Sequence, residues 1–278
     1  MRRLRARLAA VLVAVSAAGA SGAEAPLPGG GTARAGGSGV VEARYVAPTT
    51  RYAHGVLGDA IEAGGLAVKD ASGRRHVFLL PEDSVFEDIT PRLADLDGDG
   101  GAEVVVVRSY LSRGSALAVF GMRGGELVRI AETAPIGRPA RWLNPAAIAD
   151  FTGDGRPEIA VVRTPHIGGR LEFWRLAGGG LSRVGSLEGV SNHVIGSRTL
   201  GLAASGDVDG DGIADLVLPD ARRTALLAVG LAGGRARIVG RAGVPAPVVG
   251  PVSISGQRVS AGLADGRSVR VGFADFRN

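Results

Sequence analysis

The stretch Asp95-Leu-Asp-Gly-Asp-Gly-Gly-Ala-Glu-Val-Val-Val-Val107 joins a dense group of acids to a run of β-branched residues. Acids occupy positions 1, 3, 5 and 9 of this loop, and glycine occupies position 6. The carboxylates would repel one another without a cation among them, and Ca²⁺ prefers about 6–8 oxygen ligands. Gly100 permits a sharp turn around such an ion, and the carbonyl of Gly101 at position 7 would add a ligand. The sequence therefore predicts a Ca²⁺ loop whose side-chain ligands are Asp95, Asp97, Asp99 and Glu103.

The loop differs from an EF-hand, which needs an acid at position 12 and a helix on each side. Position 12 is Val106, and the run from Val104 to Val107 favours a buried strand. The sequence thus places the metal loop in a β-hairpin.

The same pattern recurs at Asp150 to Glu158 and at Asp207 to Asp215, each time followed by a short apolar run. The first acids of the three loops stand at 95, 150 and 207, so their spacings are 55 and 57 residues. Self-similarity at a nearly fixed period is typical of solenoids, propellers and other repeat arrays. The loop is therefore part of a repeated structural unit.

Each repeat contains four short apolar segments, with a glycine pair between the third and the fourth. These segments are residues 93–94, 104–107, 116–120 and 127–131 in the first repeat, 147–149, 159–162, 171–176 and 181–184 in the second, and 202–204, 216–218, 225–229 and 236–239 in the third. Four antiparallel strands repeated along a chain are typical of the blades of a β-propeller. We expect an all-β propeller of about five four-stranded antiparallel blades with Ca²⁺-binding hairpin loops.

Weaker units flank the three clear repeats. Tyr52 to Asp59 and Val77 to Leu80 would belong to a first unit, and Val259 to Asp265 and Val269 to Phe273 to a last one. The last unit has too few residues for four strands. We expect Val40 to Val46 to complete it, because a closed ring has no exposed edge strands.

Loops of this form, followed by an apolar strand and repeated near 55–60 residues, resemble the FG-GAP/VCBS repeats of the integrin-α N-terminal region and of many bacterial secreted proteins. The resemblance covers about residues 90–240. It implies that each loop joins the first two strands of a blade and binds Ca²⁺, up to three ions in all. The implied ligands are Asp95, Asp97, Asp99, Gly101 and Glu103; Asp150, Thr152, Asp154, Arg156 and Glu158; and Asp207, Asp209, Asp211, Ile213 and Asp215. Gly101, Arg156 and Ile213 would contribute carbonyl oxygens. Thr152 replaces a carboxylate, so the second loop should be the weakest site.

If the metal loops join the first and second strands, the other connections between strands gather at the opposite end of the sheets. Ligands tend to bind where loops from a rigid scaffold converge. The candidate ligand-binding residues in these segments are His54, Glu87, Asp88, Arg141, Trp142, Asn144, His166, Asn192, His193 and Arg198. The alternative is that these groups only bond one unit to the next.

The chain begins with arginines, an apolar run and small residues, so residues 1–23 are predicted to be a signal peptide. Residues 24–39 are rich in Gly, Ala and Pro and predict a disordered leader, and residues 40–278 a single propeller domain. We expect the mature protein to be periplasmic or secreted and not to span a membrane. The net charge of +5 falls to about +1 without the four arginines of the signal peptide, and the remaining arginines are scattered. This pattern disfavours nucleic-acid binding.

The function expected from the sequence is a Ca²⁺-binding module without catalysis that recognises a glycan, a peptide or a protein. An alternative is a hydrolase or lyase acting on a polysaccharide or phosphoester, with Glu87 or Asp88 and His54 or His193 as acid and base. A third possibility is a purely structural domain. The sequence contains no nucleophile elbow, phosphate-binding loop or zinc motif, so the question of enzymatic activity stays open.

Overall fold

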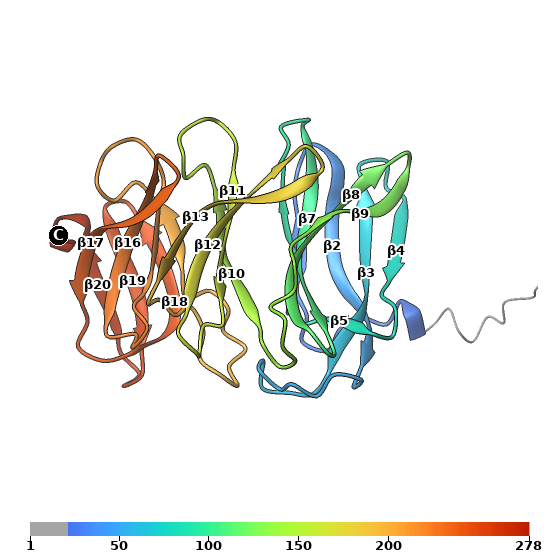
Figure 1. Cartoon of the computed structure of the whole chain (residues 1–278), viewed down its shortest axis with the longest axis horizontal. Helices are drawn as coiled ribbons and strands as arrows, with labels where there is room; N and C mark the ends of the chain where they lie inside the picture. The colour runs from blue at the N-terminus through green and yellow to red at the C-terminus, as the bar shows by residue number, and fades with distance from the viewer. Residues whose placement is uncertain (1–21, 278) are drawn as a thin grey trace, which may run out of the picture.

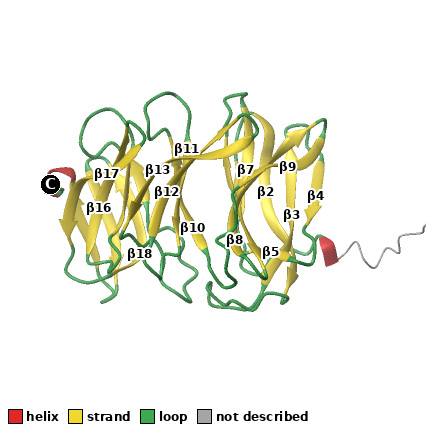
Figure 2. Cartoon of the chain, in the orientation of Figure 1, coloured by secondary structure: helices red, strands yellow, loops and turns green. Residues whose placement is uncertain are grey.

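The computed structural model describes residues 22–277 and consists almost entirely of β-strands joined by loops (Figures 1 and 2). The predicted signal peptide lies outside the described residues except for its last two positions. Within the described range, no helix is long and apolar enough to cross a membrane. The prediction of an all-β chain is confirmed.

The N-terminal half forms a nine-stranded sheet. Its strands are β1 (Thr32–Arg34), β2 (Ser38–Thr49), β3 (Glu62–Asp70), β4 (Arg75–Leu79), β5 (Ser84–Phe86), β6 (Arg92–Ala94), β7 (Gly101–Tyr110), β8 (Gly114–Arg123) and β9 (Glu126–Glu132). The sheet contains two antiparallel runs of four strands, β1 to β4 and β6 to β9. The second run contains the first acidic loop, between β6 and β7.

β5 and β6 act as one interrupted strand, because both pair with β7. Phe86 in β5 lies opposite Arg108, whereas Arg92 in β6 lies opposite Val105. The five residues between them, from Glu87 to Pro91, leave the ladder. This break turns Glu87 and Asp88 into the interior, where both are fully buried.

Two four-stranded antiparallel sheets and one three-stranded sheet follow. The second sheet has strands β10 (Leu143–Ala149), β11 (Glu158–Arg163), β12 (Arg170–Ala177) and β13 (Gly180–Glu188). The third has β14 (Ala204–Gly206), β15 (Asp215–Pro219), β16 (Ala225–Ala232) and β17 (Arg235–Gly243). The last has β18 (Val248–Ser255), β19 (Arg258–Leu263) and β20 (Ser268–Gly272), followed by a 3₁₀ turn, Phe273–Asp275.

The sheets follow one another along the long axis of the molecule, with the N-terminal sheet at one end and the C-terminal strands at the other (Figure 1). Each of the three acidic loops joins the first two strands of a four-stranded antiparallel unit, as the sequence predicts. This arrangement is consistent with a β-propeller-like fold.

Two expectations about strands in the N-terminal region are wrong. The strand predicted to complete the last unit is part of β2, which pairs with β3 from Val40 to Thr49. Its inward residues Val40 and Tyr45 pack in a buried cluster with Leu66 of β3, so pairing with its sequence neighbour buries its apolar face. Tyr52 to Asp59, predicted to be a strand, forms a loop.

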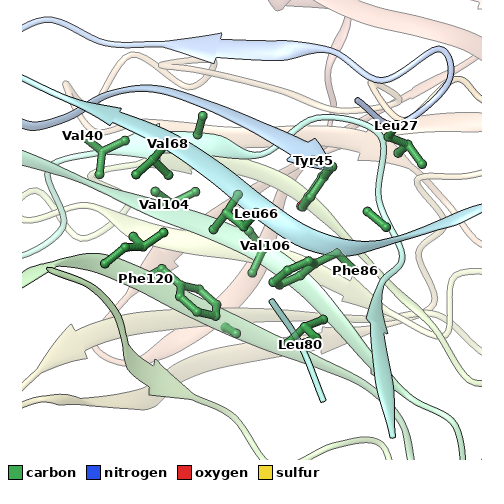
Figure 3. Close-up of a cluster of buried hydrophobic side chains, with 14 residues drawn as sticks. Leu27, Val40, Tyr45, Leu66, Val68, Leu80, Phe86, Val104, Val106 and Phe120 are labelled. Atoms are coloured by element: carbon green, nitrogen blue, oxygen red, sulfur yellow. The ribbon is translucent and has the colours of Figure 1, made fainter. Parts of the chain in front are cut away.

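Residues 24–39, predicted to be disordered, pack against the first sheet. Leu27 is 6% exposed and lies in the core cluster with Tyr45 and Phe86 (Figure 3). The Ser38 N–H donates to the carbonyl of Gly100 at 3.1 Å, and residues 38 and 39 pair in parallel with the start of β7. The segment is ordered because backbone hydrogen bonds and one apolar anchor offset its glycine-rich composition.

Four buried apolar clusters hold the sheets together. One of them combines the two runs of the first sheet, with Leu66 from β3, Val104 and Val106 from β7, and Phe120 from β8 (Figure 3). β7 is buried at every position, which explains the run of four valines at its centre. The clusters occupy the middle of the strands, so the candidate sites are formed by the loops at the two strand ends.

Candidate functional sites at the two ends of the strands

The three acidic loops share one hydrogen-bonding pattern. The carboxylate at position 1 accepts N–H groups from positions 4 and 6, as Asp95 does from Gly98 at 2.7 Å and from Gly100 at 2.9 Å. Asp150 and Asp207 repeat these contacts at 2.7–3.0 Å. Positive φ angles at Gly98 and Gly100 allow the turn, so the glycines at positions 4 and 6 are required by the backbone.

The carboxylates at positions 5 and 9 are fixed in the same way in all three loops. Asp99, Asp154 and Asp211 accept the N–H groups of Gly101, Arg156 and Ile213, the residues predicted to supply carbonyl ligands. Glu103, Glu158 and Asp215 accept the N–H group of position 2, at 2.9–3.0 Å. The loops are therefore held in shape by their own backbone.

The position-9 carboxylates are buried beside other acids. Burial, with the charges of Asp97 and Asp99, raises the pKa of Glu103 to about 7. Burial, with the charges of Asp209 and Asp211, raises the pKa of Asp215 to about 6. Both carboxylates therefore lie where a nearby positive charge would stabilise their ionised form.

The first and third loops fit a hard divalent cation. Oxygens of Asp95, Asp97 and Asp99 lie within 4.8 Å of one another, as do oxygens of Asp207, Asp209 and Asp215. A cavity of about 20 Å³, lined in part by Asp209, Asp211, Asp215 and Gly230, adjoins the third loop. Carboxylate oxygens at this separation are the donor set that Ca²⁺ uses.

The second loop does not offer such a set, because the guanidinium of Arg175 lies among its side chains. Arg175 donates to Asp154 at 2.6 Å, to Thr152 at 2.6 Å and to Glu158 at 2.8 Å through Nε, with a second, closer contact from Nη2 to Glu158. Hydrogen bonds from Arg175 are the leading cause that lowers the pKa of Asp154, against the opposing effect of burial.

A pocket lies at the opposite end of the strands from the acidic loops. In the second sheet, Ala149 pairs with Glu158 beside the loop, whereas Leu143 pairs with Arg163 at the other end. The segments next to this far end, residues 140–142 and 164–167, line a pocket of about 470 Å³. His54 and Ile195 complete its lining from two other loops.

An aromatic group forms one wall of this pocket. The rings of Trp142 and His166 are stacked, with centroids 6.2 Å apart and planes inclined by 10°. His193 meets the edge of Trp142 at 4.8 Å, and its Nδ1 lies 2.9 Å from Nε2 of His166. Burial lowers the pKa of His166 to about 4, and nearby positive groups add to the effect. His166 is therefore neutral at physiological pH.

Beneath this wall, His54 lies against the buried carboxylate of Glu87, with 2.6 Å between Nδ1 and Oε1. The Trp142 indole N–H donates to the backbone carbonyl of Glu87 at 2.9 Å. Ser109 donates to the other oxygen of the same carboxylate. Glu87 thus orients both His54 and Trp142 from the break between β5 and β6.

Two non-glycine residues of the pocket have backbone φ angles in the left-handed region, Ala140 at 50° and Thr164 at 49°. The Ala140 N–H donates to the hydroxyl of Tyr52 at 3.1 Å, and the Thr164 N–H donates to the carbonyl of Trp142 at 2.8 Å. Such angles are uncommon away from glycine and persist only where neighbouring contacts hold them. These two hydrogen bonds hold the pocket rim in its conformation.

The structure divides the ten predicted ligand-binding residues. His54, Arg141, Trp142 and His166 line the pocket. Glu87, Asp88, Asn144, Asn192 and His193 are fully buried. Asn144 and Asn192 donate to each other's backbone carbonyls, and Asp88 accepts from Tyr45 and Arg92. Arg198 instead pairs with Asp59 and donates to Gly29.

The sequence analysis missed three residues that shape these sites. Ile167 and Ile195 line the pocket and are 61% and 69% exposed, which is unusual for isoleucine. Arg175 lies within a segment that was predicted only as a strand. Arg175 could have been identified from its position opposite Glu158, but that position is known only once the register of β11 and β12 is known.

One comparison with known proteins found a match. A family model described as an FG-GAP-like repeat matches residues 95–161 and again residues 150–218. The two matches include all three acidic loops and the whole second sheet, and they reach into the third sheet as far as residue 218 in β15. No curated protein matches the chain.

Proposed function

Since the chain carries FG-GAP-like repeats across residues 95–218, we propose that it is a Ca²⁺-binding propeller of about five units that recognises a ligand without catalysis. The supporting observation is the 470 Å³ pocket at the far end of the strands from the acidic loops. In this proposal Ca²⁺ holds the strand ends together, and the pocket supplies recognition. The protein would act outside the cytoplasm, where Ca²⁺ is abundant.

The lining of the pocket favours a ligand with an apolar face and a few polar groups. Ile167 and Ile195 offer exposed apolar surface, whereas Trp142 is only 2% exposed, and Arg141 adds a cation at the rim. The partly exposed ring of His166 can stack on the apolar face of a sugar or on a flat side chain. His166 is neutral, so it acts as a hydrogen-bonding group rather than a charge. A glycan or a short peptide segment suits this surface.

Ligand-array screening followed by tryptophan-fluorescence titration tests the proposal. Glycan and peptide arrays would supply hits, and each hit would be titrated while the emission of Trp142 is followed. Trp174 lies in β12 outside the pocket, so Trp174→Phe would remove its background emission. We expect saturable binding that changes the emission.

Two isoleucines provide a matched pair of variants. Ile195→Ser changes the pocket, and Ile238→Ser changes a residue that is 44% exposed in β17 and outside the pocket. We expect the first variant to weaken binding by at least tenfold and the second to leave it unchanged. Equal effects of the two substitutions would rule out this pocket as the binding site.

A second candidate function is hydrolysis or lyase chemistry at the same pocket. It is favoured by the His54 and Glu87 pair, because a carboxylate that orients an imidazole is a common arrangement for a general base. Chromogenic glycosides and phosphoesters would test for turnover. His54→Gln should abolish any turnover and preserve binding, whereas absence of turnover on every substrate would exclude this candidate for those classes.

A further inference from the structure

The three acidic loops differ at one position on the neighbouring strand. Extending the printed registers by one residue places Gly121 opposite Glu103, Arg175 opposite Glu158 and Gly230 opposite Asp215. The position that faces the last acid of the loop is therefore glycine in the first and third repeats and arginine in the second. These three positions are equivalent, because each faces the last acid of its own loop.

Neither glycine places a side chain beside the acid, and each lies close to it. A Cβ atom added at Gly230 would lie 3.0 Å from both Oδ1 of Asp215 and a methyl group of Val239, and one added at Gly121 would lie 2.6 Å from Cδ1 of Ile130 and 3.5 Å from Oε1 of Glu103. Gly230 also lines the cavity of about 20 Å³ described above, which is large enough for one water molecule or metal ion.

In the second loop the arginine side chain fills the equivalent space. Its guanidinium contacts the side chains at positions 3, 5 and 9, which are three of the groups that would bind the ion. Arg175 is 19% exposed and Glu158 is fully buried, so this is a built contact within the protein. The position-1 acid, Asp150, keeps its backbone hydrogen bonds as in the other loops.

The net charge of each loop also indicates that Arg175 replaces an ion in the second loop. The first and third loops each carry four carboxylates, so one divalent cation would leave these side chains a net charge of −2; in the first loop the half-exposed Arg123 also pairs with Asp97 and Glu103. The second loop carries three carboxylates, and the one guanidinium of Arg175 also leaves −2. The replacement of an acid by Thr152 therefore accompanies the gain of a built-in positive charge.

We propose that Arg175 takes the place of the metal ion in the second loop, so the chain binds two Ca²⁺ ions instead of the three that its repeats suggest. This inference rests on the Ca²⁺ part of the proposed function for the other two loops. The second repeat then keeps its shape when Ca²⁺ is removed.

Calorimetric titration of the chelator-treated protein with Ca²⁺ tests the inference. We expect two equivalents for the wild type, and one for either Asp97→Asn or Asp209→Asn. Asp154→Asn should still bind two, because its loop takes no ion. The double variant Thr152→Asp/Arg175→Gly restores the pattern of the other loops and should bind three. Arg123→Ala, whose half-exposed arginine lies 3.0 Å from Asp97 and 3.9 Å from Glu103 of the first loop, is the control and should still bind two.

Three equivalents for the wild type, or a loss of one equivalent in Asp154→Asn, would overturn the inference and leave the Ca²⁺ proposal intact. No binding at all would refute the Ca²⁺ proposal. The role of Arg175 would then be tested by melting temperatures measured in the presence of chelator. Arg175→Met should melt at least ~4 °C below Arg123→Met, and equal melting temperatures would overturn the inference that Arg175 stabilises the second loop.

Discussion

Replacing Glu62 by glutamine should remove a pH-dependent loss of stability. Glu62 begins β3 and is 1% exposed, and its Oε1 has no hydrogen-bond partner in residues 22–277. Burial raises its pKa from 4.5 to about 9, and the charges of Glu87, Asp59 and Asp88 add to the effect. The folded protein therefore holds a proton on Glu62 that the unfolded chain releases.

The sign of the effect follows from the two pKa values. The folded state binds the extra proton between pH 4.5 and about 9, so stability is highest below pH 4.5 and falls as the pH rises through this window. Each pH unit costs about 1.4 kcal/mol, which amounts to about 2–3 kcal/mol between pH 5 and pH 7. Glutamine has no proton to release, so the variant should lack this slope.

Urea unfolding at half-unit steps from pH 5 to pH 8 measures the difference. The free energy of unfolding of Glu62→Gln, relative to wild type, should rise by about 2 kcal/mol or more from pH 5 to pH 7. Glu126→Gln changes an exposed residue of β9 and should give a curve parallel to that of the wild type. If Glu62→Gln also runs parallel to the wild type, Glu62 is ionised in the folded protein and the reasoning is wrong.

Three further predictions concern the metal loops, the N-terminal segment and the pocket. Chelation should lower the wild-type melting temperature by at least ~4 °C, and Asp209→Asn should lose part of that response; no shift on chelation would refute a stabilising metal. Leu27→Ala should cost about 2–4 kcal/mol in urea unfolding because it empties a site in the first core, whereas a cost below ~0.5 kcal/mol would mean that residues 24–39 are not packed. His166 has a pKa lowered to about 4, so stability should fall as the pH drops from 6.5 toward 4. His166→Gln should flatten that fall by about 1–2 kcal/mol, and an unchanged acid slope would contradict the assignment.

The strands and loops that depend on local pattern could be predicted from the sequence. The spacing of Asp95, Asp150 and Asp207 gave the repeats, and the apolar runs after them gave the strands. The end of the sheets at which Trp142 and His166 lie also followed, because antiparallel order separates the two ends of a hairpin. These inferences need only neighbours along the chain.

Features that depend on contacts between distant segments could not be predicted in this way. The pairing of β2 with β3 depends on how Val40 and Tyr45 fill the first core, and no local pattern distinguishes that partner from the last sheet. Residues 24–39 have the composition of a disordered segment, yet Leu27 anchors them. Arg175 resembles any polar residue of a strand until the register places it opposite Glu158.

The contact between Ser38 and Gly100 has a practical consequence for choosing where a recombinant version of this protein should begin. A version that starts at residue 40, the domain boundary that composition suggests, would lose β1, Leu27 and the residue that ties the N-terminal arm to the first acidic loop. Cation affinity measured on such a shortened protein would then describe an untethered loop. Keeping the chain from Glu24 onward retains this tether.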